Sequence, residues 1–350
     1  QMVRWHVRRG MFELDVTRTM HRGVRRFFRE EHLVDIFDFF IKYVGSAATR
    51  APGFMNLMPT IQFEHDLWYV DGGMVQMARA LRRLGEELGI TFHTDCRVDR
   101  ILVDDGCCKG LAVGSRTLTG FSHIVSNMEV IPARRELLEE DERDLKRLKR
   151  FEPACSGLVV HLGLDRVYPE LAHHNFFFSR NQREHFNSVF KEKKLPDDPT
   201  IYLVAPTRTD PGQAPEGCDN LKILPHIPHI NDRHFYTQDD YLQYRNRILD
   251  KLERMGLTDL RQHIVVEDVW TPYDIQRRYA SNKGAIYGVV TDMWKNFGFK
   301  APKKSRNCDN LYFVGGSVNP GGGMPMVILC GQHVARMIDE EASSNKNDTA

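Results

Sequence analysis

A glycine-rich segment near the end of the chain has the residue types of a ligand-binding loop. It reads GGSVNPGGGMPMV, from Gly315 to Val327, and holds five glycines and two prolines in thirteen residues. The apolar run LYFV precedes it, and a stretch with helical spacing follows it. Glycine-rich turns between a strand and a helix commonly hold a phosphate or a cofactor ring. The segment contains no GKS or GKT, which excludes a P-loop, and it lacks the GxGxxG spacing of dinucleotide binding.

The chemistry of this loop suits a flavin ring. Gly315 and Gly316 leave the backbone bare where the strand ends, and residues 321–323 can adopt positive φ and expose consecutive N–H groups. A helix that starts at Pro325 would direct the positive end of its dipole at the ligand, where a reduced flavin carries negative charge. A phosphate fits less well because the loop has no Lys or Arg. A tight turn that needs glycine for its geometry alone is the alternative.

Histidine and cysteine are frequent, but neither forms a metal or catalytic motif. None of the histidines belongs to an HExxH or a zinc-type set, including His173, His174, His226, His229 and His234. The seven cysteines contain no CxxC, and their odd number favours a reducing cytosol over a disulfide scaffold. GxSxG is absent, which disfavours a serine hydrolase. We therefore expect no bound metal, and the sequence identifies no catalytic base.

The composition indicates a globular protein with room for two domains. The chain has 350 residues, of which 41% are hydrophobic and 27% are charged. A net charge of +1 argues against general nucleic-acid binding, and no apolar run is long enough to cross a bilayer. The chain starts with Gln1, and its Arg-rich opening lacks the apolar core of a signal peptide. We expect it to be the interior of a longer protein, truncated at its N-terminus.

Residues 1–65 are expected to be a helical region. Apolar residues recur with helical spacing through HLVDIFDFFIKYV, namely Leu33, Phe37, Phe40, Ile41 and Val44. Their aromatic character could line a hydrophobic tunnel or touch lipid, with Arg25, Arg26 and Arg29 facing anionic headgroups. A helix packed in a core, with a solvated basic face, is the alternative.

Residues 66–150 change to a pattern of helix, hairpin and strand. Asp105-Gly106 predicts a hairpin turn, HIVSN at 123–127 predicts a short buried strand, and the charged stretch 135–152 predicts one solvated helix between domains. A helix that ends at Gly89 carries its apolar residues on one face: Met74, Met77, Ala78, Leu81, Leu84 and Leu88.

Residues 151–295 predict a mixed α+β domain. Strand-like runs occur at 157–164, 200–206, 223–230 and 264–270, and helices are expected at 239–256 and from Pro272. The long helix is expected to direct Tyr241, Ile248, Leu249, Leu252 and Met255 inward. Phe176, Phe177 and Phe178 could line an apolar tunnel, although a buried strand is the simpler interpretation. Residues 296–350 then supply the last strand, the glycine loop and a terminal helix.

Four segments together resemble the phytoene desaturase family of carotenoid-processing flavoproteins. DNLYFVGGSVNPGGGMPMVILCGQHVARMI resembles the C-terminal flavin signature of that family, which is a specific motif. WYVDGGMVQMARALRRLGEELGITFHTDCRVDRI, HIVSN and APEGCDNLKILPHIPHI resemble further segments in the same order. The resemblance covers nearly the whole chain.

The resemblance implies an FAD-dependent oxidoreductase that introduces double bonds into a long isoprenoid polyene, phytoene or a related carotenoid, by hydride transfer to flavin. It implies an α/β fold with a Rossmann-like FAD-binding domain whose first βαβ unit is missing, a mixed α+β substrate domain at 151–295 and a membrane-facing helical region at 1–65. The FAD domain would comprise 66–150 and 296–350. The flavin would contact Gly315, Gly316, Gly322, Gly323, Met324 and Pro325, with Val98 on the adenine side.

Two departures leave alternatives open. The family's N-terminal GxGxxG is absent, so the pyrophosphate site has no assignment here. Val318-Asn319 stands where the desaturases often have Thr-His, which leaves open a carotenoid terminal oxidase or a retinoid saturase-like enzyme. An inactive fragment that lacks the pyrophosphate site is the non-enzymatic alternative. For the enzyme we expect an apolar polyene as substrate, a cytoplasmic location with peripheral membrane contact, and no nucleic acid as partner.

Overall fold

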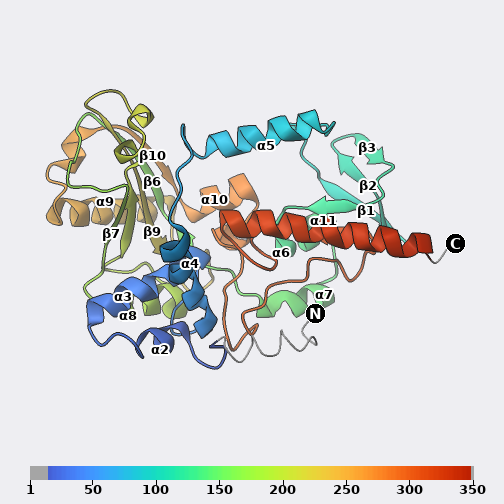
Figure 1. Ribbon diagram of the computed structural model, residues 1–350, viewed down its shortest axis with the longest axis horizontal. Helices are drawn as coiled ribbons and strands as arrows, with labels where there is room; N and C mark the ends of the chain where they lie inside the picture. Colours follow the sequence, from blue (N-terminus) through green and yellow to red (C-terminus); the bar gives the residue numbers. More distant parts are fainter. Residues whose placement is uncertain (1–14, 348–350) are drawn as a thin grey trace. The chain divides into compact units, whose positions relative to one another are not determined.

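The computed structural model describes residues 15–347. Its contacts divide the chain into two compact units, which are described separately. Unit 1 contains the described residues up to Pro59, Cys96–Cys155 and those from Ile275 onward, and unit 2 contains Thr60–Asp95 and Ser156–Asp274. Both units mix helices and strands, which confirms the α/β content of the predicted fold (Figure 1). The domain bounds expected from the sequence stay a prediction beside this division.

Unit 2 is built on one antiparallel sheet. The strand order is β10-β6-β9-β8-β7, and the short β5 pairs with β9. The bounds are β5 Ser156–Gly157, β6 Val159–Leu164, β7 His174–Phe177, β8 Ile201–Val204, β9 Asp219–Ile227 and β10 Ile264–Trp270. Four of these strands were expected from the sequence, because apolar β-branched residues fill them. The Phe176 to Phe178 run lies on and beside edge strand β7, where Phe177 is buried and Phe176 stacks on Tyr202 at 5.2 Å.

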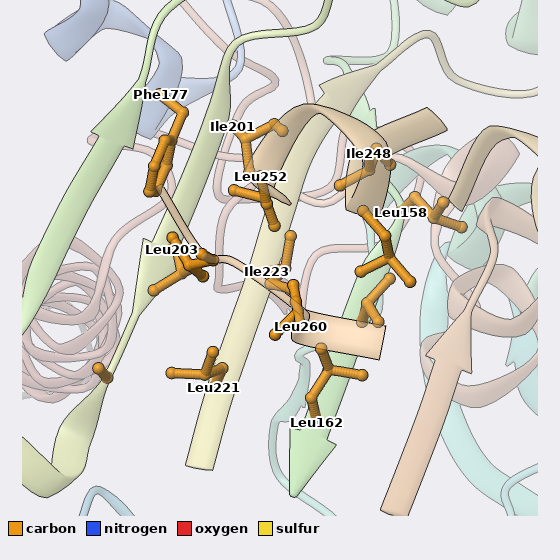
Figure 2. Packing of buried hydrophobic residues seen from close by; sticks show 14 of the residues in the cluster. Leu158, Leu162, Phe177, Ile201, Leu203, Leu221, Ile223, Ile248, Leu252 and Leu260 are labelled. Atoms are coloured by element: carbon orange, nitrogen blue, oxygen red, sulfur yellow. The ribbon is translucent and has the colours of Figure 1, made fainter. Parts of the chain in front are cut away.

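Helix α9, Gln238–Arg254, covers the apolar core of this sheet. A capping box starts it, since the Thr237 side chain accepts from the Asp240 N–H and Asp240 accepts in return. Figure 2 shows Ile248 and Leu252 of α9 among the strand residues Leu162, Ile201, Leu203 and Ile223. Of the five residues predicted to point inward, Met255 is wrong: it is 48% exposed, because the helix ends there.

The remaining helices of unit 2 are short, apart from α5. They are α8 Gln182–Phe186, η5 Asn187–Glu192, η6 Pro206–Arg208, η7 Pro211–Gln213 and η8 Leu260–His263. Helix α4, Leu57–His65, and helix α10, Pro272–Tyr279, run across the division between the units. Helix α5, Val75–Glu87, forms as predicted, but its apolar face is open: Leu81 is 55% and Leu84 50% exposed.

The helical front of unit 1, which is its described part from residue 15 to Pro59, agrees with the predicted helical region; residues 1–14 of that region lie outside the described residues. The front contains α2 Met20–Val24, α3 Glu31–Phe39, η1 Phe40–Val44 and η2 Gly53–Asn56. The expected apolar stripe is only partly buried, since Ile41 is fully buried but Leu33 is 41% exposed. Within α3 the buried residues are Val34, Asp38 and Phe39, so the predicted stripe through Leu33 and Phe37 is not the face that packs, and the chain changes to 3-10 geometry at Phe40. Among residues 15–347 no helix is both long and apolar enough to span a membrane.

Unit 1 also holds a three-stranded antiparallel meander, β1 Arg100–Asp104, β2 Cys107–Val113 and β3 Arg116–Thr119. The predicted hairpin at Asp105-Gly106 is confirmed, with positive φ at both residues. The predicted strand in HIVSN is β4, Ile124–Ser126, which pairs in parallel with β11, Leu311–Phe313. Asn310 joins the meander to this pair, because its side chain bonds both the N–H and the C=O of Cys108.

The charged stretch at 135–152 does not form the single helix that the sequence predicted. It follows α6, Val130–Pro132, and divides among η3 Ala133–Leu137, α7 Glu142–Lys146 and η4 Arg147–Arg150. Glu139 adopts φ of 49°, which interrupts the helical run. Leu148 and Phe151 are buried in the core of unit 1, so this segment is packed and not merely solvated.

Candidate cofactor site at the glycine loop

The glycine loop leaves the carboxyl end of a parallel strand pair. Strand β11 ends at Phe313, the loop follows, and helix α11 runs from Met324 to Asn347 (Figure 1). Because β4 is parallel to β11, both strands end at the same edge, where open α/β sheets bind ligands. Val314 donates its N–H to Ser126 O at 3.0 Å. A Cβ at Gly315 would lie 2.9 Å from Asn127 Oδ1, so the end of β4 packs directly against the start of the loop.

Three further segments of unit 1 contact the first half of the loop. Gly288 has φ of +71°, and a Cβ there would lie 3.0 Å from the carbonyl carbon and oxygen of Gly316. Ser317 is buried, and its Oγ accepts from the Val130 N–H at 3.0 Å. The backbone of Ala301 donates to Ser317 O at 3.3 Å. The first half of the loop is therefore held by three separate parts of unit 1.

Lys300 supports the second half of the loop. Its N–H donates to Asn319 Oδ1 at 3.2 Å, and its Nζ donates to Val289 O. A Cβ at Gly321, where φ is +124°, would lie 2.7 Å from Lys300 Cε. Lys300 is only 6% exposed, so an ammonium group is buried beside the loop. The sequence prediction missed this cation because it considered only Lys and Arg residues within the loop.

Glu129 is half-buried and lies close enough to Lys300 for the two charges to interact. Burial lowers the pKa of Lys300 to about 8, and the charge of Glu129 opposes that change. Burial raises the pKa of Glu129 to about 7, although the Asn282 N–H, which donates to its Oε2 at 3.2 Å, favours the carboxylate. The two groups come from segments 171 residues apart in the chain. The sequence hardly indicates this pair: it shows only that Glu129 comes shortly after the strand HIVSN.

The predicted loop residues are brought together by the structure. Gly315 is buried against Asn127, Gly316 and Gly322 are half-buried, and Gly323, Met324 and Pro325 are exposed. A Cβ on Gly322 would have its nearest neighbour, Tyr287 O, at 3.6 Å, so the loop itself does not require glycine for space there. Bare backbone at Gly316 and Gly322, next to the first turn of a long helix, fits a flat ring with an anionic edge. The residues present therefore fit a flavin.

Val98 is placed elsewhere in unit 1. It lies half-buried directly before β1, and its neighbour Asp99 bonds Ala112 and Gly114 of the meander. Within residues 15–347 no hydrogen bond joins this segment to the glycine loop. Its role on the adenine side stays a prediction. The same described residues contain no group of three or more His, Cys, Asp or Glu side chains placed to hold a metal.

Known proteins resemble this chain over most of its length. A 4,4'-diapolycopene oxygenase of Methylomonas sp is 57% identical over 326 residues, which are 93% of this chain and 66% of that protein. A 4,4'-diaponeurosporene oxygenase of Staphylococcus aureus (strain MRSA252) is 50% identical over 348 residues, which are 99% of this chain and 70% of that protein. The chain thus spans about two thirds of the length of these relatives.

Solved structures share the fold at much lower identity. An oxidoreductase from Methanosarcina mazei has a TM-score of 0.60 at 16% identity, covering 96% of this chain and 74% of that one. A putrescine oxidase with bound putrescine also has a TM-score of 0.60, at 13% identity, covering 97% of this chain and 70% of that one. The family of flavin-containing amine oxidoreductases matches residues 7–339. These findings confirm the resemblance to a flavoprotein family, and the chain belongs to the flavin-containing amine oxidoreductases.

Proposed function

We propose that the protein is an FAD-dependent oxidoreductase that oxidises a long carotenoid polyene to oxygen-containing products. The observation that carries the proposal is the identity of 57% and 50% to proteins named as oxygenases of 4,4'-diapolycopene and 4,4'-diaponeurosporene. The glycine loop supports it, since its exposed backbone fits a flavin ring. Desaturation of the polyene, which the sequence suggested first, is the second candidate.

The bound flavin would supply the capacity to accept a hydride equivalent. The chain's own contribution is to place and polarise the ring. Gly316 and Gly322 would allow the ring to approach the backbone. Helix α11 begins at Met324, directly after Gly323, and the positive end of its dipole would stabilise negative charge on the ring. Lys300, Ser317 and Gly288 keep the loop in one conformation, so little reorganisation is needed when the ring binds. We propose Val98 as a contact on the adenine side, and we assign no catalytic base.

Adding one methyl group at Gly322 tests the flavin site. In Gly322→Ala the new Cβ meets only ordinary contacts within the protein, so the fold should persist. We expect the dissociation constant for FAD to rise by roughly tenfold or more, because the methyl group separates the ring from the backbone. Flavin titration by fluorescence measures it. Gly331→Ala in helix α11, where a Cβ has open space, is the control and should bind FAD like the parent chain. Equal affinity in Gly322→Ala would contradict the site.

Product analysis separates the two candidate reactions. The FAD-loaded protein is incubated with 4,4'-diaponeurosporene in air, and the products are analysed by mass spectrometry. We expect products that have gained oxygen. Products that have only lost pairs of hydrogen atoms would favour desaturation, and an FAD-loaded protein that leaves the polyene unchanged would contradict both candidates.

We also propose that the protein makes peripheral contact with the cytoplasmic face of a membrane through its helical front. In support, Phe27 is 78%, Leu33 41% and Ile36 42% exposed, with Arg26 beside the Phe27 ring. We expect Phe27→Glu to reduce flotation with vesicles that contain phosphatidylglycerol. Phe235→Glu is a matched control, because Phe235 is 79% exposed in unit 2. Equal flotation of both variants and the parent chain would rule out this front as the contact.

A further inference from the structure

Unit 1 contains a cavity that the flavin site does not use. Its volume is about 490 Å³, within the range of pockets that hold small molecules. Three segments form it: the turn around α6 and η3, the segment from α7 to Pro153, and the turn at Asn282 and Lys283. The lining residues are Ile131, Arg135, Leu145, Leu148, Lys149, Phe151, Pro153, Asn282 and Lys283.

The floor of the cavity is apolar and well supported. Leu148 and Phe151 are 5% and 4% exposed and belong to the buried cluster of unit 1. Ile131 and Leu145 pack against the same cluster. The half-buried Ile131 and Leu145 offer apolar surface that a ligand can cover, and the buried Leu148 and Phe151 hold that surface in place.

The mouth of the cavity is cationic. Arg135, Lys149 and Lys283 are exposed side chains in its lining, and no Asp or Glu is among the described residues that line it. Arg135 bonds Glu136 at 2.7 Å. A smaller hollow that shares Leu148 and Phe151 with this cavity is lined by further cations, Arg150 and Arg147 among them, and Arg147 pairs with Asp144 at 3.7 Å. The positive charge therefore extends around η4 and favours an anion at the mouth.

The turn that carries Lys283 is held in place. Lys283 has φ of +55°, a conformation that residues other than glycine rarely adopt. Its neighbour Asn282 is buried and donates its N–H to Glu129 Oε2 at 3.2 Å. This contact fixes the third wall of the cavity relative to the end of β4, so the cationic mouth and the apolar floor keep their separation.

We propose that this cavity binds an amphiphile with a single apolar chain and an anionic head. The floor accepts the chain, and Lys149 and Lys283 face the head. A neutral polyene would make no use of the cations, and inorganic phosphate would leave the apolar floor empty. The inference stands independently of the proposed function, because no residue of the glycine loop lines the cavity.

Dodecyl phosphate, used below its micellar concentration, is the probe for this site. Isothermal titration with the full chain as purified is expected to show saturable binding. The double variant Lys149→Gln/Lys283→Gln should weaken that binding by roughly tenfold, because two cations that face the phosphate are lost. The control Lys146→Gln/Lys109→Gln removes two lysines outside the lining and should bind like the parent chain. Circular dichroism checks that all the variants are folded.

Titrations with dodecanol, inorganic phosphate and vesicles distinguish this site from apolar binding alone, phosphate binding alone and binding to a membrane surface. Dodecanol should bind more weakly than dodecyl phosphate and with no response to the double variant, and inorganic phosphate should not displace the probe. Equal affinity for dodecanol and dodecyl phosphate would overturn the proposal, as would full displacement by phosphate or equal affinity in the double variant. Binding to phosphatidylglycerol vesicles without binding of the monomeric probe would also overturn it, since the cations would then serve a membrane surface and not a cavity.

Discussion

Replacing Gly288 by alanine is expected to lower the free energy of unfolding by about 3 kcal/mol and to weaken flavin binding. Two effects add. An alanine at φ of +71° is strained by about 1 kcal/mol. Its Cβ would also lie 3.0 Å from the Gly316 carbonyl group, and backbone atoms cannot rotate away as a side chain would, so the overlap costs about 2 kcal/mol more. Chemical denaturation measures the first quantity, and flavin titration measures the second.

Gly106→Ala is a closely matched control. Gly106 has φ of +70° in the β1–β2 turn, and a Cβ there would have no neighbour within 4 Å. Alanine at Gly106 therefore tests backbone strain without the overlap, and we expect a loss of about 1 kcal/mol with flavin affinity unchanged. If both variants lose the same stability, Gly288 does not brace the loop.

Local patterns in the sequence were sufficient for elements that depend on neighbouring residues. Asp105-Gly106 predicted the hairpin because only two adjacent residues with positive φ are needed to close it. The glycine loop was also predictable, since its strand, bare backbone and helix are consecutive in the chain. The run at 135–152 failed because periodicity says nothing of the break at Glu139 or of the core that receives Leu148.

Contacts between distant segments could not be predicted in this way. The support of the loop by Gly288 and Lys300, and the burial of Glu129 beside Lys300, depend on tertiary packing. A single sequence shows glycine and lysine at these positions without indicating what they approach. The cationic cavity is a similar case, since its lining comes from three separate segments. Charges that look like a solvated helix in the sequence are gathered around an apolar floor in the fold.

Glu129→Gln is expected to make the protein more stable than the parent chain near neutral pH but not in acid. Burial raises the pKa of Glu129 from 4.5 to about 7 in the folded protein. Between these values the folded protein keeps a proton that the unfolded chain has lost. The contribution of Glu129 to stability is therefore fully present below pH 4.5 and is lost as the pH rises to about 7. The loss is on the order of 3 kcal/mol.

Glutamine resembles the protonated acid in shape, and its side-chain oxygen can still accept from the Asn282 N–H. Because an amide does not ionise, residue 129 of this variant does not titrate between pH 4.5 and 7. Lys300, which faces Glu129, has a pKa of about 8 and keeps its charge over most of the same range. The stability difference between Glu129→Gln and the parent chain should thus grow from near zero at pH 4.5 to its full value near pH 7. Urea denaturation across this range measures it, with the exposed Glu170→Gln as control. Parallel curves for Glu129→Gln and the parent chain would mean that Glu129 is solvated in the folded protein. The positive charge of Lys300 beside the glycine loop would then have no buried carboxylate in Glu129 to compensate it.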